Sequence, residues 1–146
     1  MTHIGETERV TQNRLVVLFK NELKYTYLGD WKDRENNRNI EEELLQNFLK
    51  NRGYATQEIA MAIRKLKEAA HNLNSGLYNA NKEVYGLLRY GVNIKPEPGQ
   101  NSKNVYLIDW KNPLANDFYI AEEVSIKGCN TKRPDMVVYV NGIVLL

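Results

Sequence analysis

The sequence predicts a mixed α/β (α+β) domain in which helices pack on a central β-sheet. Apolar residues recur at helical spacing in the first half, whereas short alternating or continuous apolar runs dominate the second half. Asn141-Gly142, between two apolar runs, is typical of a β-hairpin turn. A chain of 146 residues with 42% apolar content can bury one core. We therefore expect a single domain over 1–146, helical over 1–91 and strand-rich over 92–146.

Four helices are expected in the first half. Thr7 can cap the first helix, which places Glu8 in the first turn, where the helix dipole favours negative charge. Asn39 is expected to cap the second, with Ile40 on its apolar face and Gly53 ending it. The expected helices cover about residues 7–23, 39–53, 59–73 and 81–90.

Short strands are expected between and after these helices. The prolines and the glycine of 96–99 predict a loop, and the apolar run of 136–140 suits a strand buried on both faces. The stretch 118–126 alternates in part, so Glu122 and Glu123 are expected at the surface on opposite faces. The expected strands cover residues 25–28, 105–110, 118–126 and 136–140, followed by the Asn141-Gly142 hairpin.

Composition excludes several function classes. Cys129 is the only cysteine, so neither an internal disulfide nor a cysteine-rich zinc site can form. Neither GxxxxGK[ST] nor GxGxxG occurs, so this stretch carries no ATP chemistry, and His3 and His71 have no recurring partner. A signal-peptide pattern and an apolar run of membrane-spanning length are both missing, which favours a cytoplasmic protein without membrane contact.

Asp135 is the strongest candidate for chemistry, because it stands where the apolar run of 136–140 begins. Pro134 fixes the approach of the backbone, and the apolar strand would hold the carboxylate still. Mg²⁺ usually takes one or two protein carboxylates and keeps several waters. The sequence therefore indicates a divalent-metal site at Asp135. The alternative is a strand-entry or turn residue bonded to nearby backbone.

A second carboxylate would strengthen such a site. Glu8 could project from the first helix towards a sheet packed on that helix. Its alternative role is to complement the helix dipole. Asp109 is either a strand-end residue beneath the site or an exposed one.

Several stretches, in this order, resemble the N-terminal region of type I restriction enzyme R (HsdR) subunits. The resemblance extends across nearly the whole chain and is carried by the ordered set more than by any one piece. The stretches are Thr7-Glu8 with Thr11-Gln12, Tyr106-Leu107-Ile108-Asp109-Trp110, Asn116-Asp117-Phe118, and Arg133-Pro134-Asp135 running to Asn141-Gly142.

The resemblance implies a restriction-endonuclease-like PD-(D/E)xK nuclease domain. Asp135 falls on the family's catalytic, metal-binding Asp, and Glu8 falls on the helix-one Glu that often completes such sites. The family's E-x-K is expected just past Leu146, so the fold is expected to be incomplete at the C-terminal hairpin. We therefore expect this chain alone to be inactive.

For the full-length protein, the resemblance implies an ATP-dependent, type I site-specific endodeoxyribonuclease that requires Mg²⁺. The ATP would be used by motor domains that this sequence does not contain. The expected partners are double-stranded DNA and the modification and specificity subunits of the restriction complex.

A non-catalytic DNA- or subunit-docking module is the alternative function. The loop 31–38 combines an aromatic residue with basic ones and could meet phosphates and stack on bases. A second basic cluster covers 127–133, although the net charge of +2 does not by itself indicate nucleic-acid binding. A stand-alone enzyme of another class is disfavoured, because these residues assemble no complete catalytic set. The residues of the loop 31–38 that would make the proposed DNA contacts are Trp31, Lys32, Arg34 and Arg38.

Overall fold

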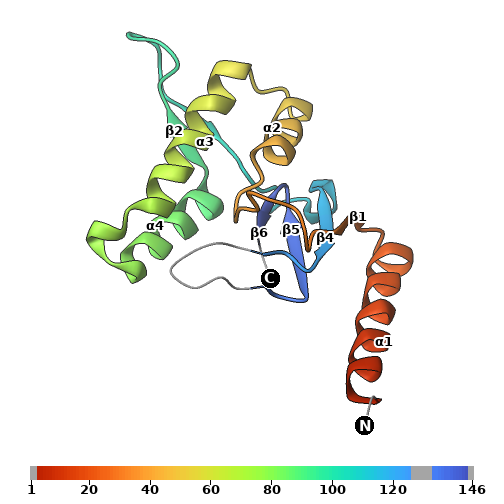
Figure 1. Ribbon diagram of the computed structural model, residues 1–146. Coiled ribbons are helices and arrows are strands. Elements are labelled where there is room, and N and C mark those ends of the chain that lie inside the picture. Colours follow the sequence, from red (N-terminus) through yellow and green to blue (C-terminus); the bar gives the residue numbers. More distant parts are fainter. Residues whose placement is uncertain (1–2, 126–132, 145–146) are drawn as a thin grey trace. The chain divides into compact units, whose positions relative to one another are not determined.

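The computed structural model describes residues 3–125 and 133–144, and it has the mixed α+β character that the sequence predicts (Figure 1). The chain divides into two compact units, Met1–Glu41 with Asp117–Leu146, and Glu42–Asn116. We call the first the sheet unit and the second the helical unit. The helical unit is one continuous segment, whereas the sheet unit combines both ends of the chain.

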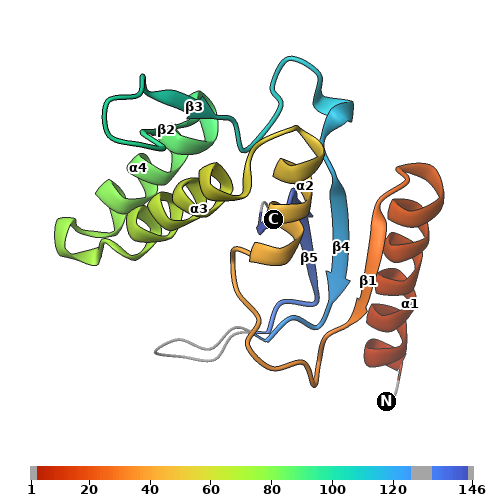
Figure 2. The same cartoon turned by 90° about the horizontal axis from the view of Figure 1, so that it is seen from above.

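The sheet unit contains a four-stranded sheet in the order β1-β4-β5-β6. β1 runs parallel to β4, and the other neighbouring pairs are antiparallel. In Figure 2 the first helix lies alongside the β1 edge of this sheet. The elements are α1 (His3–Val17), the π-helical turn η1 (Leu18–Glu22), β1 (Thr26–Asp30), β4 (Phe118–Glu122), β5 (Met136–Val140) and β6 (Ile143–Val144).

The two faces of the sheet differ in chemistry because successive side chains on a strand point to opposite faces. One face carries a buried cluster of Ala121, Val124, Val137 and Tyr139, against which Trp31 packs. The register pairs Ala121 with Val137, so these two neighbours share that face. Glu122, one residue further along β4, therefore points to the opposite face.

The hairpin turn that Asn-Gly predicts is confirmed. Val140 pairs with Ile143, which leaves Asn141 and Gly142 as a two-residue loop. Both loop residues have positive φ, 54° and 89°, as a type I′ turn requires. The turn is also held by β4, since the side-chain oxygen of the buried Asn141 accepts the N–H of Asp117 at 2.7 Å.

The helical unit has three helices, a two-stranded hairpin and an apolar core of its own. Gly91 follows the last helix at φ 90°, which confirms the predicted stop. The elements are α2 (Glu42–Asn51), α3 (Thr56–His71), the 3-10 turn η2 (Leu73–Ser75), α4 (Leu77–Tyr90), β2 (Val92–Ile94), β3 (Lys103–Val105) and the 3-10 turn η3 (Pro113–Ala115). The core residues include Leu45, Phe48, Leu49, Ile59, Ala62, Ile63, Leu66, Ala69, Val92, Ile94, Val105 and Leu107.

Several predicted boundaries are wrong, because tertiary hydrogen bonds and local turns override helix and strand propensity. The first helix already begins at His3, so Glu8 is not in its first turn. Ile40 is not helical but forms a β-bridge with Ile143. The strand expected over 105–110 ends at Val105, and the Asp109 carboxylate then accepts backbone N–H groups in a turn.

Two further boundaries differ for similar reasons. The third helix ends at His71, and the next residue, Asn72, has ψ 69°, outside the helical region. Leu73 is therefore not on the helical face and is 66% exposed. β4 ends at Glu122 because Glu123 adopts φ 53° and turns the chain.

Candidate functional site

Asp135 lies immediately before β5, with its side chain exposed. Its carbonyl oxygen accepts two hydrogen bonds, one from the backbone N–H of Glu123 at 2.9 Å and one from Nε2 of Gln12 at 3.3 Å. Over 3–125 and 133–144, no hydrogen bond or ion pair occupies the Asp135 carboxylate. Hydrogen bonds therefore restrain the main chain of Asp135, while its exposed carboxylate is available to a ligand.

Glu8 is exposed on α1, four residues before Gln12. Residues four apart lie on the same face of a helix, about 5–6 Å apart at Cβ. Because Gln12 contacts the Asp135 carbonyl, Glu8 belongs to the face of α1 that meets the start of β5. The structure thus brings this stretch of the helix beside Asp135 without a direct bond between the two acids.

Glu122 is not at the surface, so that prediction is wrong. Only 4% of the residue is exposed, and two side chains donate hydrogen bonds to its carboxylate. Gln12 Nε2 lies 2.6 Å from Oε2, and the Tyr27 hydroxyl lies 2.5 Å from Oε1. Arg9 adds an ion pair at 3.8 Å from its exposed position on α1. Residues from α1 and β1 thus converge on the end of β4 and compensate the buried charge.

The Tyr27 hydroxyl responds to this environment. Burial, followed by its hydrogen bond to the Glu122 carboxylate and the charge of that group, raises the pKa of Tyr27 to about 12. Loss of the phenol proton would place a second negative charge against the first. Tyr27 therefore remains a donor to Glu122 throughout the physiological pH range.

Sequence reasoning missed Gln12 and Glu122 as members of this cluster. Two signals were available. Gln12 follows Glu8 at helical spacing, and Glu122 shares its strand face with the apolar Ile120, two residues before it. The contact between these residues was not predictable, because it depends on how α1 packs against the sheet.

The loop proposed for DNA docking uses much of its chemistry internally. The Arg34 guanidinium carbon lies 3.7 Å from the centre of the Trp31 ring, and Arg34 pairs with Glu41 at 3.0 Å. The Trp31 indole N–H donates to the carbonyl of Leu28. Trp31 and Arg34 therefore stabilise the loop, and Lys32 remains exposed. The second basic cluster, with Cys129, lies almost wholly outside the described residues.

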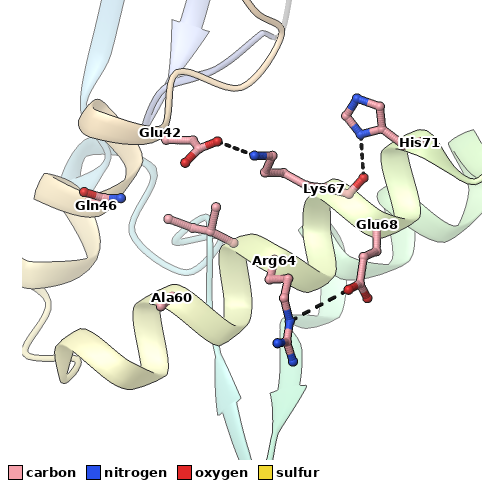
Figure 3. Close-up of a pocket in the computed structure, with 8 residues that line it drawn as sticks. Glu42, Gln46, Ala60, Arg64, Lys67, Glu68 and His71 are labelled. Carbon is pink, nitrogen blue, oxygen red and sulfur yellow. Dashed lines mark hydrogen bonds and ion pairs between the residues drawn. The ribbon is translucent and has the colours of Figure 1, made fainter.

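A groove of about 460 Å³ runs between α2 and α3 in the helical unit (Figure 3). Its charged side chains pair with one another. Lys67 Nζ lies 2.6 Å from a Glu42 oxygen, and Arg64 and Glu68 form a longer pair at 3.8 Å. His71 Nδ1 lies 2.7 Å from the Lys67 carbonyl oxygen, in the last turn of α3. The Lys67–Glu42 pair joins the two helices, whereas the other two contacts lie within α3.

Asp109 belongs to the helical unit and has a structural role there. The backbone N–H of Asn112 is the main cause that lowers the pKa of Asp109, and Arg52 pairs with the carboxylate at 3.0 Å. The carboxylate therefore closes the turn before η3. Asp109 and Asp135 belong to different units.

Over residues 3–125 and 133–144, no group of three or more His, Cys, Asp or Glu side chains is arranged to hold a metal ion. Asp135 and Glu8 remain a prediction as metal ligands. In the same part of the chain, none of the helices has the length and apolar character needed to cross a membrane.

Comparison with known proteins identifies relatives named as subunits of type I restriction enzymes. One relative, from Methanocaldococcus jannaschii, is named as the endonuclease subunit of type I restriction enzyme MjaVIIIP. It is 35% identical over 68 residues, which cover 44% of this chain and 7% of the relative's own length. The MjaIXP endonuclease subunit of the same organism is 25% identical over 149 aligned positions, 92% of this chain and 14% of its own length. The chain thus spans only a small part of these relatives.

A family model described as the N terminus of the type I restriction enzyme R protein matches residues 5–146. The match includes α1 from Gly5 onward, all four strands of the main sheet and Asp135. This chain therefore belongs to the family of type I restriction enzyme R protein N-terminal regions.

Proposed function

We propose that this chain supplies part of a Mg²⁺-dependent endonuclease site of the PD-(D/E)xK kind, in a type I restriction enzyme R subunit that cuts double-stranded DNA. Asp135 would be the principal metal ligand and catalytic carboxylate, with Glu8 as the second acid. Modification and specificity subunits would be the partners, and separate motor domains would use ATP.

The observation that carries this proposal is the hydrogen bond from Gln12 to the Asp135 carbonyl. It ties the helix that carries Glu8 to the backbone of Asp135, although the two acids are 127 positions apart in the sequence (135 − 8). Family membership alone would give the two residues a role, whereas this contact supports a shared location for them.

The side chains present fit Mg²⁺ as part of a site. Both carboxylates are exposed, and neither has a hydrogen bond or ion pair within 3–125 and 133–144. Buried Glu122 is a poor ligand, because Gln12, Tyr27 and Arg9 already satisfy its oxygens. Mg²⁺ would activate water and neutralise charge on a phosphodiester. Two carboxylates alone are few ligands, so we expect activity only in the complete subunit.

The test is Asp135→Ala in the complete R subunit, assembled with its partner subunits. We expect DNA cleavage to fall at least 100-fold while ATP-driven translocation is unchanged, because only the metal site loses a ligand. Asp33→Ala, which removes an exposed acid from the loop after β1, is the matched control and should leave both activities intact. Equal loss of both activities in Asp135→Ala would instead indicate a folding role for this residue.

A docking module without metal chemistry remains the competing function, and the same variant separates it. DNA binding by such a module would decrease steeply with added salt and would persist in Asp135→Ala. DNA cleavage that also persists in Asp135→Ala would contradict the nuclease proposal.

A further inference from the structure

The amide of Gln12 occupies an unusual place between two acceptors. Its nitrogen lies 2.6 Å from the Glu122 carboxylate and 3.3 Å from the carbonyl oxygen of Asp135. A primary amide has two N–H donors, so one nitrogen can serve both acceptors at once. Gln12 is itself 93% buried, and it joins α1 to the ends of both β4 and β5.

Glu122 determines how that amide is oriented. An ionised carboxylate accepts hydrogen bonds only, so it selects the nitrogen of Gln12 over the oxygen. The Tyr27 hydroxyl and the Arg9 guanidinium lie on the same carboxylate and hold it in place. With one amide proton directed to Glu122, the other is available to the Asp135 carbonyl.

We infer that Gln12, oriented by Glu122, is a positioning residue for Asp135. This inference rests on the proposed nuclease function and adds residues to it that neither family membership nor sequence pattern assigns. Gln12 does not touch the metal or the DNA in this proposal. It acts on the peptide group of Asp135, whose carbonyl it shares with the backbone N–H of Glu123.

The physical effect is preorganisation of an exposed ligand. Asp135 immediately precedes the buried strand β5, which fixes its backbone on that side. Two donors on its carbonyl restrain the peptide plane, and hence the direction of the carboxylate. Groups that orient a metal ligand in this way commonly contribute 10- to 100-fold to metal affinity.

The experiment measures metal binding where it occurs, without requiring activity. The complete R subunit is incubated with Fe²⁺ and ascorbate, which cut the backbone near a bound ion, and cleavage near residue 135 is followed against Fe²⁺ concentration. Gln12→Met removes both donors at nearly the same side-chain length. Asn13→Met is the matched control, because Asn13 is the next residue of α1 and is exposed.

We expect Gln12→Met to raise the half-saturating Fe²⁺ concentration near residue 135 about tenfold. Asn13→Met should leave it unchanged, and Asp135→Ala should abolish local cleavage. Adding Gln12→Met to Asp135→Ala should cause no further loss of DNA cleavage, because the two residues act on one site. If Gln12→Met does not fold, Gln12→Asn keeps the amide but shortens its reach, and the same increase is expected.

The possible failures are distinguishable. The positioning role alone is overturned if the Gln12→Met subunit folds and its half-saturating Fe²⁺ concentration equals that of the wild type. This holds whether its melting temperature is unchanged or lowered. The proposed function would survive, provided that Asp135→Ala still abolishes local cleavage. The metal site, and this inference with it, is overturned if Fe²⁺-dependent cleavage near residue 135 persists in Asp135→Ala. It is also overturned if the wild type shows no such cleavage near residue 135.

Discussion

At the scale of single residues, the sheet unit depends on a buried carboxylate. Glu122 is 4% exposed, and a charge in such a place is tolerated only with close partners. Its partners come from α1 and β1, so one side chain fastens both elements to β4. Removing it would leave a hydroxyl, an amide and a guanidinium without their acceptor, which costs more than losing an exposed acid.

Glu122→Ala is therefore expected to lower the free energy of unfolding of the sheet unit by about 3 kcal/mol, since hydrogen bonds to charged groups contribute about 1.5–3 kcal/mol each. Trp31, which packs near Tyr139, can report unfolding by fluorescence in a Trp110→Phe background during a urea titration. Glu35→Ala, at an exposed loop position, should change the free energy by less than about 0.5 kcal/mol. Equal effects would contradict the role assigned to Glu122.

Tyr27 predicts a pH dependence with a definite sign. Its pKa is raised from 10.0 to about 12, so the folded protein binds the phenol proton more tightly than the unfolded chain does. The resulting stabilisation is complete below about pH 10 and is lost as the pH rises towards 12. Tyr139, whose pKa burial also raises to about 12, contributes in the same direction.

Tyr27→Phe should therefore be less stable than wild type by about 1–2 kcal/mol at pH 8. The difference should shrink between pH 10 and 12, because the wild type alone loses the Tyr27 contribution there. Urea titrations at pH 8 and pH 11 measure it, and Tyr139 cancels because both proteins contain it. A difference that stays constant with pH would show that Tyr27 does not donate to the carboxylate.

At the scale of elements, the β5–β6 hairpin is set by local backbone chemistry. Gly142 has φ 89°, a region that costs a residue with a side chain roughly 1–2 kcal/mol. Gly86, in contrast, lies within α4, and an added methyl group there would meet nothing within 4 Å. Substitution by alanine should therefore change the free energy of unfolding in opposite directions at the two positions.

Gly142→Ala is expected to destabilise the sheet unit by about 1–2 kcal/mol. Gly86→Ala should stabilise the helical unit by about 0.5–1 kcal/mol, because alanine favours a helix over glycine by that amount. Trp110 fluorescence in a Trp31→Phe background follows thermal unfolding of the helical unit, and Trp31 fluorescence in a Trp110→Phe background follows that of the sheet unit. A destabilising Gly86→Ala would mean that α4 is not helical at this position.

How far the sequence predicts the structure depends on whether the determinants are local. The hairpin at Asn141-Gly142 and the helix stop at Gly91 were predictable, because backbone geometry demands these residues there. The prediction that Ile40 is helical was wrong because its β-bridge partner, Ile143, is 103 positions away in the sequence (143 − 40). In the candidate site, the position of Asp135 at the start of an apolar strand was predictable, whereas its contact with Gln12 depends on tertiary packing.

At the scale of the whole molecule, the helical unit interrupts the sheet unit in sequence. The two chain ends at this interruption meet the same turn of the sheet unit. The backbone N–H of Glu41 donates to the Gly142 carbonyl at 2.7 Å, and that of Asn141 donates to the Asp117 carbonyl at 2.8 Å. Because Asn141 and Gly142 are neighbours, Glu41 and Asp117 must lie close together, as the ends of an inserted segment do.

Each unit should therefore fold without the other. The segment 42–116 carries its own buried core, and a chain in which four to six Gly/Ser residues join Glu41 to Asp117 keeps α1, all four strands and Asp135. We expect both proteins to unfold cooperatively in urea. We also expect the pKa of Tyr27 to be raised in the shortened chain as it is in the intact one. If instead the shortened chain lacks a folded spectrum while 42–116 folds, the sheet unit depends on the helical unit. The Glu122 cluster would then require contacts that its own hydrogen bonds do not include.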